Sequence, residues 1–383
     1  MTGSNALTRF KQIFDNRHQY AQDWKSSNGR QVMGFFCTYA PEEIIYAAGL
    51  LPVRIFGSHQ VQDITDKHIF PLWCPYCRDC LYEGLSGHYD YLDGILNTWC
   101  CQHIRSTYIS WWRNIKSLSY HHEIYWPVPL HTEPSRVVAT KSFERFQGTL
   151  EELTGAPITR KALQDATEIF NRSRRLMRDV YDLRKRPHPP LSGAQAMDMV
   201  VASQVMDKQE HSLLAEQTLR ELSGAPGPPD PGVRLMIMGS ENDDRDLVRF
   251  IESMGATVVI DDHCTGTKYL WEDVPVGDDK DLISAITNRY IAKPACPNRD
   301  VANPGRRHPT HVLGLARDWG VQGVIFIQEK FCDPHLWDYP VIEKTLKENG
   351  LPTLALEVDV TTPVGQFRTR LEAFLETLQL EVA

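Results

Sequence analysis

Short apolar runs alternate with amphipathic segments along the first third of the chain, and this alternation limits the fold more than any other feature. Residues 6–26 read as an amphipathic helix. Residues 30–57, RQVMGFFCTYAPEEIIYAAGLLPVRIFG, then read as strand, turn, helix and strand, with Pro41 at a first helical position. Further strands are expected within 90–99 and 122–129, on either side of a helix over 101–115. Strands separated by helices pair in parallel, so the sequence predicts an α/β fold.

The same alternation returns after a helical region. From about 141 to 222 the pattern is helical, with Thr159 as an N-cap and Ser192 and Gln195 as a capping box. The stretch SGAPGPPDPG at 223–232 can continue neither a helix nor a strand. Beyond it we expect four strands alternating with helices, including helices near 309–319 and 338–349.

We therefore predict two doubly wound parallel-sheet domains with a helical insertion between them. The expected boundaries are an N-terminal α/β domain over 1–140, a helical region over 141–222 and a C-terminal α/β domain over 233–383. The first strand-to-helix turn of the second α/β domain, MGSEND, is not the glycine-rich turn of dinucleotide-binding folds. Nucleotide binding by this chain therefore has no motif behind it.

Charge and hydropathy exclude two large classes of protein. The formal net charge is −8 and there is no long Lys/Arg run, which argues against a nucleic-acid-binding surface. No stretch of about 18 apolar residues is present, so no membrane span is expected. The N-terminal residues lack the apolar core of a signal peptide, and we expect a cytoplasmic protein.

The nine cysteines gather at places where α/β proteins bind ligands. A reducing compartment argues against a disulfide framework and for metal binding or catalysis. Ligands of open α/β sheets bind beyond the carboxyl ends of the parallel strands. Five cysteines follow predicted strands in this way, which predicts one shared site: Cys37, Cys100, Cys101, Cys264 and Cys332.

Two cysteines also stand at the start of predicted helices. Cys74 precedes Pro75 and resembles an N-cap, and Cys101 opens the helix that follows its strand. Unpaired N–H groups at a helix N-terminus favour a thiolate. Arg78 and Arg105 each follow such a cysteine by four residues, so we expect these cations to offset negative charge at the site.

The spacing of the thiols leaves the kind of metal centre open. A structural zinc ion prefers two tight Cys pairs, whereas here CPYCRDC is followed by the adjacent pair Cys100 and Cys101, so zinc is the second choice. A bacterial ferredoxin run would need a fourth cysteine where this chain has Gly84. Iron–sulfur ligation by thiols from several separate loops remains consistent with the sequence.

The chain resembles the 2-hydroxyacyl-CoA dehydratase and benzoyl-CoA reductase family. The resemblance extends over nearly the whole chain and is carried by GFFCTYAPEEIIYAAGLLPVRI (34–55), CPYCRDCLYEGLSG (74–87), LDGILNTWCCQHIRSTY (92–108), DDHCTGTKYL (261–270) and EKFCDPHLWDYP (329–340). Within the family, the chain is most similar to the smaller, gamma-type cluster-bearing subunits of ATP-dependent benzoyl-CoA reductases.

The resemblance implies an architecture and a set of partners. Family proteins pair two homologous subunits, each with two Rossmann-like domains and an iron–sulfur cluster between them. A separate ATP-hydrolysing iron–sulfur component supplies the electrons, with ferredoxin as the upstream donor. The implied function is delivery of low-potential electrons to the ring of benzoyl-CoA, which yields a cyclohexadiene carbonyl-CoA. The alternatives are a 2-hydroxyacyl-CoA dehydratase subunit and a zinc-stabilised scaffold without redox chemistry.

The resemblance also implies ligands for the cluster. Cys74, Cys101 and Cys332 occupy the ligand positions, and Cys37 is expected as a further ligand, whereas Cys264 and Cys296 are not. A [4Fe-4S] cluster is expected. A larger, sulfide-bridged cluster is the alternative, because Cys77, Cys80 and Cys100 exceed the simpler dehydratase pattern. His103, Glu83 and Tyr108 lie near these ligands in the sequence, but no pattern marks any of them as a proton donor.

Overall fold

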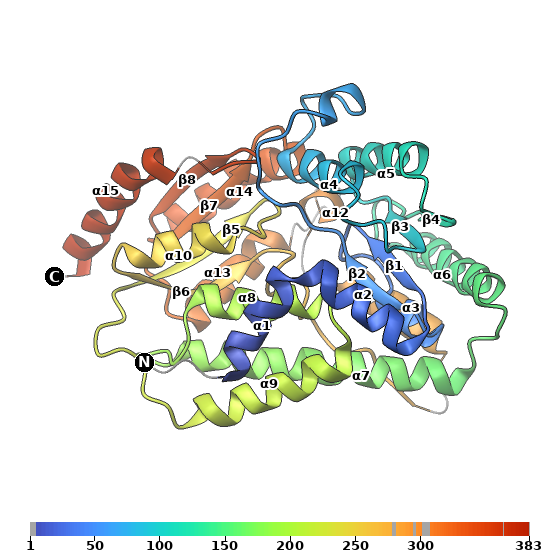
Figure 1. Ribbon diagram of the computed structural model, residues 1–383. Helices are drawn as coiled ribbons and strands as arrows, with labels where there is room; N and C mark the ends of the chain where they lie inside the picture. The colour runs from blue at the N-terminus through green and yellow to red at the C-terminus, as the bar shows by residue number, and fades with distance from the viewer. Residues whose placement is uncertain (1–4, 278–280, 294–295, 301–306, 363, 383) are drawn as a thin grey trace.

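Two four-stranded parallel sheets lie side by side (Figure 1) in the computed structural model, which describes residues 5–277, 281–293, 296–300, 307–362 and 364–382. The N-terminal sheet has the order β2-β1-β3-β4 and the C-terminal sheet the order β6-β5-β7-β8. All six neighbouring pairs are parallel, which confirms the predicted fold class. The strands are β1 (Val32–Phe35), β2 (Leu51–Arg54), β3 (Gly94–Thr98), β4 (Tyr120–Ile124), β5 (Val233–Gly239), β6 (Ala256–Asp262), β7 (Gly323–Glu329) and β8 (Thr353–Val358).

The central strands of both sheets are covered on both faces. Every residue of β1, β3 and β7 is buried, as expected for parallel strands whose two faces carry helices. Gly239 ends β5 with φ of 124°, and a Cβ there would lie 2.3 Å from the carbonyl oxygen of Ile327. Only glycine allows this approach of β5 to β7. The turn that follows β5 therefore begins directly beside the end of β7.

Both sheets share one connection pattern, and it fixes where a ligand can bind. In each sheet the chain crosses from the first strand to the outer neighbour on one side and then returns to the other side, between β1 and β3 or between β5 and β7. The carboxyl ends of two such neighbouring strands leave a crevice, because the connections that follow them run in opposite directions. Each sheet therefore supplies one crevice.

The helices of the first lobe follow the prediction with one difference. The predicted helix over 6–26 is broken at Asn16 into two. The helix after Pro41 and the helix after Cys101 are present as expected. The elements are α1 (Asn5–Asp15), α2 (Arg17–Asn28), α3 (Glu42–Ala47), η1 (Thr65–Lys67), α4 (Pro75–Leu85) and α5 (Gln102–Asn114).

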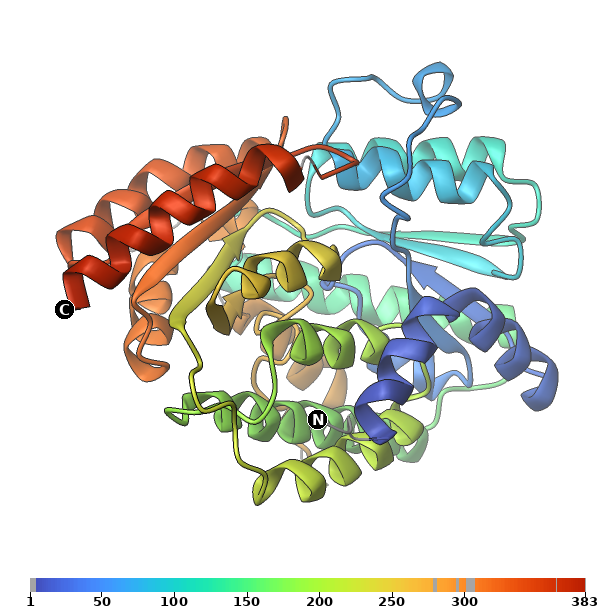
Figure 2. The same ribbon diagram turned by 60° about the vertical axis from the view of Figure 1, so that its left-hand side comes forward.

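The helical region packs along one side of both sheets, with α7 and α9 side by side (Figures 1 and 2). Thr159 caps α7 and Ser192 forms the capping box with Gln195, which confirms both predicted helix starts. The first helix begins at Glu133, before the expected 141, because Thr132 caps it. The elements are α6 (Glu133–Thr154), α7 (Arg160–Asp182), η2 (Leu183–Lys185), α8 (Gly193–Ser203) and α9 (Lys208–Ser223).

The second lobe contains helices that the sequence analysis placed differently or missed. The helix expected from 338 begins at Asp333, and α11 was not predicted. Helix α11 packs against the first lobe, where the hydroxyl of Tyr290 donates to the carbonyl oxygen of Ala40 at 2.6 Å. The elements are α10 (Arg245–Ser253), α11 (Leu282–Ala292), α12 (Pro297–Asp300), α13 (His308–Asp318), α14 (Asp333–Glu348) and α15 (Val364–Val382). The domain boundaries given above stay a prediction.

Among the described helices, none combines the length and the apolar composition that crossing a membrane requires.

Candidate functional site

The crevices of the two sheets face each other across one cavity of about 300 Å³. The cavity is lined by loops that follow β1, β3, β5, β6 and β7, and by the first turns of α5 and α14. Its wall also includes Phe36, Tyr39, Ile104 and Trp337, which give it an apolar character. Seven of the nine cysteines line it: Cys37, Cys74, Cys100, Cys101, Cys264, Cys296 and Cys332.

Three of these cysteines are the N-cap residues of long helices. Cys74 caps α4, Cys101 caps α5 and Cys332 caps α14, and a proline follows in the first turn of α4 and α14. The Cys101 sulfur accepts a hydrogen bond from the N–H of Ile104 at 3.4 Å. The positive ends of three helices therefore meet at one cavity, but at Cys74 and Cys332 burial and neighbouring thiols outweigh the preference of a helix N-terminus for a thiolate.

The thiols of the first lobe form a hydrogen-bonded row. A hydrogen bond from the Cys100 thiol lowers the pKa of Cys37 to about 6 against the effect of burial, and the positive charge of Lys293 acts in the same direction. The shared hydrogen bond with Cys100 also lowers the pKa of Cys101. Thiolates are the metal-binding form of cysteine, so the lowered pKa values favour that form at Cys37 and Cys101.

Cys74 and Cys332 are instead held in the neutral form. Hydrogen bonding to Cys77 and burial raise the pKa of Cys74 well above its usual range. Burial, followed by the nearby Cys74, raises the pKa of Cys332 in the same way. Several thiolates in one buried cavity repel each other, and a bound cation removes that repulsion. The donor set therefore fits a positively charged centre that thiolates hold, such as an iron–sulfur cluster.

The remaining two cysteines lie beneath the cavity. Cys77 and Cys80 belong to α4 and are fully buried, and the Cys80 sulfur donates to the carbonyl oxygen of Ile55 at 3.5 Å. Within the described ranges, no three or more His, Cys, Asp or Glu side chains form a group that could hold a metal ion.

The predicted cations lie beside other partners. Arg78 pairs with Asp359 at 2.5 Å. Arg105 lies 3.5 Å from Glu123 and covers the ring of Trp99. Neither arginine is among the residues that line the cavity, and their predicted role in charge compensation stays a prediction.

Two buried cations that the sequence analysis missed act on the thiols: Arg54 lines the cavity, and the charge of Lys293 lowers the pKa of Cys37. Arg54, at the end of β2, pairs with Glu241 at 2.7 Å and donates to the carbonyl oxygen of Cys264 at 3.1 Å. Lys293 follows α11 and donates to Thr38. Arg54 lies within the apolar run LLPVRIF. A single charged residue in an apolar strand is rarely buried without a partner, so this position could have indicated a buried, paired cation. Lys293 carried none, because α11 itself was not recognised.

Of the three side chains that lie near the expected ligands in the sequence, His103, Glu83 and Tyr108, only the first lines the cavity. His103 lines the cavity, where its Nδ1 accepts the N–H of Cys74 at 3.2 Å. Glu83 contacts His88 at 2.9 Å, and Tyr108 bonds His121 at 2.9 Å; neither lines the cavity.

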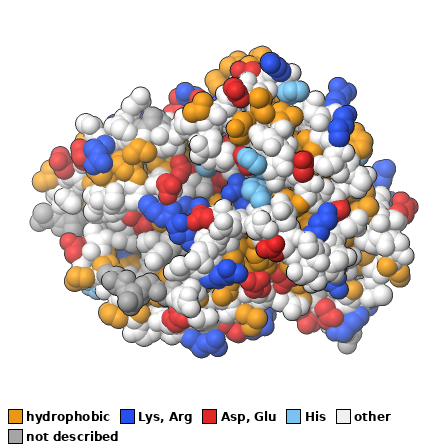
Figure 3. Space-filling view, viewed as in Figure 1, with side chains coloured by type: hydrophobic (Ala, Val, Ile, Leu, Met, Phe, Trp, Pro, Cys, Tyr) orange, Lys and Arg blue, Asp and Glu red, His pale blue; other side chains and the backbone are white. Residues whose placement is uncertain are grey.

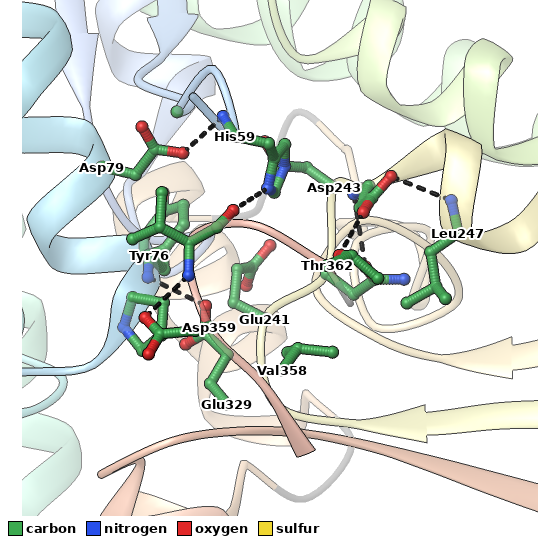
Figure 4. Close-up of a pocket in the computed structure, with 15 residues that line it drawn as sticks. His59, Tyr76, Asp79, Glu241, Asp243, Leu247, Glu329, Val358, Asp359 and Thr362 are labelled. Atoms are coloured by element: carbon green, nitrogen blue, oxygen red, sulfur yellow. Dashed lines mark hydrogen bonds and ion pairs between the residues drawn. The ribbon is translucent and has the colours of Figure 1, made fainter. Parts of the chain in front are cut away.

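A smaller cavity adjoins the first and shows how the two lobes are joined (Figure 4). It shares Tyr76, Glu241 and Glu329 with the thiol-lined cavity. The backbone N–H of His59 donates to Asp79 at 2.8 Å, while its ring contacts Asp243 of the other lobe at 3.0 Å. Burial opposes a charge on this ring, but Asp243 raises the pKa of His59 to about 10. The imidazolium therefore forms an ion pair between the lobes.

This ion pair predicts a specific dependence of stability on pH. The unfolded chain has an ordinary histidine pKa of about 6.5, so the stabilisation by His59 is complete below that pH and declines as the pH rises towards 10. We expect the free energy of unfolding to fall more steeply between pH 7 and 10 in the parent protein than in His59→Gln. Urea unfolding across this range measures the difference, with exposed His131→Gln as the control. Parallel curves for the parent and His59→Gln would contradict the assignment.

The two doubly wound lobes thus enclose a cavity lined with cysteine side chains at the carboxyl ends of their strands, where open α/β sheets bind ligands. The chain belongs to the family described as 2-hydroxyglutaryl-CoA dehydratase, D-component, whose model matches residues 37–378.

Its relatives are subunits of two kinds of enzyme. The chain is 26% identical to the (R)-phenyllactyl-CoA dehydratase beta subunit of Clostridium sporogenes over 96% of this chain and 97% of the relative. It is 26% identical to the beta subunit of (R)-2-hydroxyglutaryl-CoA dehydratase from Acidaminococcus fermentans, over 92% and 93% of the two chains. It is 27% identical to a subunit of the benzoyl-CoA reductase of Thauera aromatica, over 93% of each chain. The family expected from the sequence is thereby confirmed.

Proposed function

We propose that this chain is the iron–sulfur subunit of a benzoyl-CoA reductase, in which Cys74, Cys101 and Cys332 hold the cluster and Cys37 is a further ligand. The observation that carries the proposal is the convergence of these thiols from both lobes on one cavity. The relationship to a subunit of the Thauera aromatica benzoyl-CoA reductase supports the same assignment. The expected cofactor is a [4Fe-4S] cluster, with a larger bridged cluster as the alternative.

The cluster, when bound, would supply electrons at low potential, which in thiolate-held iron–sulfur centres reaches about −700 mV. The protein contributes the surroundings. Arg54 and Lys293 place positive charge beside the thiolates and limit their mutual repulsion. Phe36, Tyr39 and Ile104 exclude water from the cavity wall, which strengthens the electrostatic effect of those cations.

The surface around the cavity supports the predicted partners. Trp337 lines the cavity and is 72% exposed, and Phe331 and Leu336 beside it are also exposed. The segment between β2 and α4 projects from the same part of the molecule and carries exposed hydrophobic side chains, seen at the top of Figure 3. Apolar patches of this kind mark protein interfaces. We assign them to the homologous cluster-bearing subunit, with an ATP-hydrolysing iron–sulfur component and ferredoxin as the electron suppliers.

The test begins with the protein purified without oxygen together with its cognate subunits. We expect brown protein with several iron and acid-labile sulfide per chain, and net reduction of benzoyl-CoA when ATP and a low-potential reductant are supplied. Colourless, iron-free protein after cluster loading would contradict the proposal, and tightly bound zinc in its place would favour the scaffold alternative.

A second function is favoured by the beta-subunit relatives, whose names are those of 2-hydroxyacyl-CoA dehydratases. Such an enzyme would pass one electron to its substrate and recover it afterwards, with loss of water. Reversible dehydration of a 2-hydroxyacyl-CoA without net electron consumption would assign this function instead.

A further inference from the structure

The turn that follows β5 places a buried hydroxyl beside the expected ligand of the second lobe. Ser240 comes directly after Gly239, and its backbone N–H donates to the carbonyl oxygen of Ile327 at 2.9 Å. Ser240 is fully buried. Burial raises the pKa of the Cys332 thiol, whereas a hydrogen bond from the Ser240 side chain acts in the opposite direction. The two side chains therefore meet at the wall of the cavity that Cys332 lines.

The neighbouring groups determine where the Ser240 hydroxyl directs its proton. The hydroxyl oxygen accepts the backbone N–H of Glu329 at 3.1 Å and the side-chain N–H of Gln328 at 3.0 Å. The same Gln328 nitrogen donates to the carbonyl oxygen of Glu329 at 3.2 Å, so the donor end of this amide faces Ser240. A hydroxyl has two lone pairs and one proton. Because both lone pairs are occupied, the proton is left for the sulfur of Cys332.

Each lobe thus supplies a hydrogen bond to the sulfur of one expected ligand. In the first lobe the donor to Cys101 is the backbone N–H of Ile104. In the second lobe the donor to Cys332 is a side chain, which a substitution can remove. The backbone N–H of Cys332 does not take its place, because it donates to the carbonyl oxygen of Glu329 at 3.2 Å.

A hydrogen bond to a ligand sulfur affects how readily an iron–sulfur centre is reduced. Such bonds are among the factors that set the reduction potential of these centres. An added electron makes the sulfur ligands more negative, and a hydrogen bond to a charged acceptor is stronger than one to a neutral acceptor. The bond is therefore stronger in the reduced state, and a low local dielectric strengthens it further. A donor to the ligand sulfur stabilises the reduced state.

We propose that Ser240 acts through Cys332 to raise the reduction potential of the bound cluster, so that the cluster accepts an electron from its supplier more readily. The inference rests on the proposed function, because it needs a cluster that Cys332 holds. The step is a one-electron reduction, in which the cluster gains the electron that the low-potential donor loses. The hydroxyl keeps its proton, and no bond to Ser240 forms or breaks. Ser240 is thus a positioning residue.

The test measures the reduction of the anaerobic, cluster-loaded complex with Ser240→Ala. One hydrogen bond changes an equilibrium by about two- to tenfold. We therefore expect the ratio of reduced to oxidised cluster at a fixed solution potential to fall about two- to tenfold. A redox titration followed by electron paramagnetic resonance measures this ratio. Iron and sulfide content should stay as in the parent. Ser240→Gly lacks the same hydroxyl and is used if Ser240→Ala does not fold, and Ser240→Thr keeps the hydroxyl and should keep the ratio of the parent.

The matched control is Ser212→Ala. The hydroxyl of Ser212 is also buried, but it donates to the carbonyl oxygen of Lys208 at 2.8 Å in the helical region, so its loss should leave the ratio unchanged. A parent-like ratio in iron-loaded Ser240→Ala would overturn the proposal. An equal fall in Ser240→Thr would also overturn it, since that result indicates altered packing rather than a lost hydrogen bond.

Failure of the proposed function is distinguishable, because it is seen in the parent complex. A parent without iron would overturn the proposed function and this inference together. A parent that holds the cluster but eliminates water from a 2-hydroxyacyl-CoA would overturn the proposed function alone. The redox titration needs no substrate, so in that case the comparison of Ser240→Ala with the parent decides on Ser240 by the same results.

Discussion

Replacing Cys332 with alanine is expected to remove most of the iron from the anaerobically prepared protein. Cys332 is the one expected ligand from the second lobe, and it caps α14 at the wall of the cavity. Without it the remaining thiols hold a cluster from one side only. Cys74→Ala and Cys101→Ala should have comparable effects, because each also removes a sulfur at a helix N-terminus. Iron and sulfide analysis with the absorption spectrum measures the loss.

The controls are cysteines that are not expected to be ligands. Cys264→Ala and Cys296→Ala alter the same cavity and should keep their iron. Equal iron content in all these variants would show that the ligand assignment is wrong.

Replacing Arg54 with methionine is expected to destabilise the protein by about 3–5 kcal/mol, because it leaves Glu241 charged and without its ion-pair partner in a largely buried site. Burial by itself would lower the pKa of Arg54, but Glu241 together with Tyr76, Cys264 and Cys37 holds that pKa well above its usual value. The guanidinium also donates to Gln204 at 2.7 Å and to the carbonyl oxygen of Cys264. It therefore joins the first sheet, the helical region and the second lobe. Urea unfolding of the cofactor-free protein measures the change.

The matched control is an exposed pair on α14. Lys344 lies 3.8 Å from Glu348 and both are largely exposed, so Lys344→Met should change stability by about 1 kcal/mol or less. The double variant Arg54→Met with Glu241→Gln should recover much of the lost stability, because no unpaired charge remains. A small effect of Arg54→Met would show that the ion pair does not hold the lobes together.

The strands could be predicted because a run of apolar residues directly indicates a strand that is buried on both faces. Parallel strands covered on both faces read as apolar runs, and β1, β3, β5 and β7 were all located from them. Helix boundaries depend on single residues and were less certain. The start of α14 was placed too late, near 338, whereas Cys332 and the proline in the first turn mark the true start.

The cavity was predictable only in part. Cysteines at strand ends pointed to a shared site, since parallel strands place their carboxyl ends at one edge of the sheet. The structure brings Cys37, Cys74, Cys101 and Cys332 to one cavity. The positions of Cys296 and Lys293 depend on how α11 and α12 pack in three dimensions, and no short sequence pattern encodes that packing.

The origin of the cavity wall in both lobes has a consequence for folding. Cys74 and Cys101 belong to the starts of helices in one lobe, and Cys332 to the start of a helix in the other. Any group bonded to all three cysteines therefore links the two lobes. The free energy of its binding is then shared by the entire chain rather than by one half. In a chain that has lost the group, we expect the two lobes to separate from each other before either lobe unfolds.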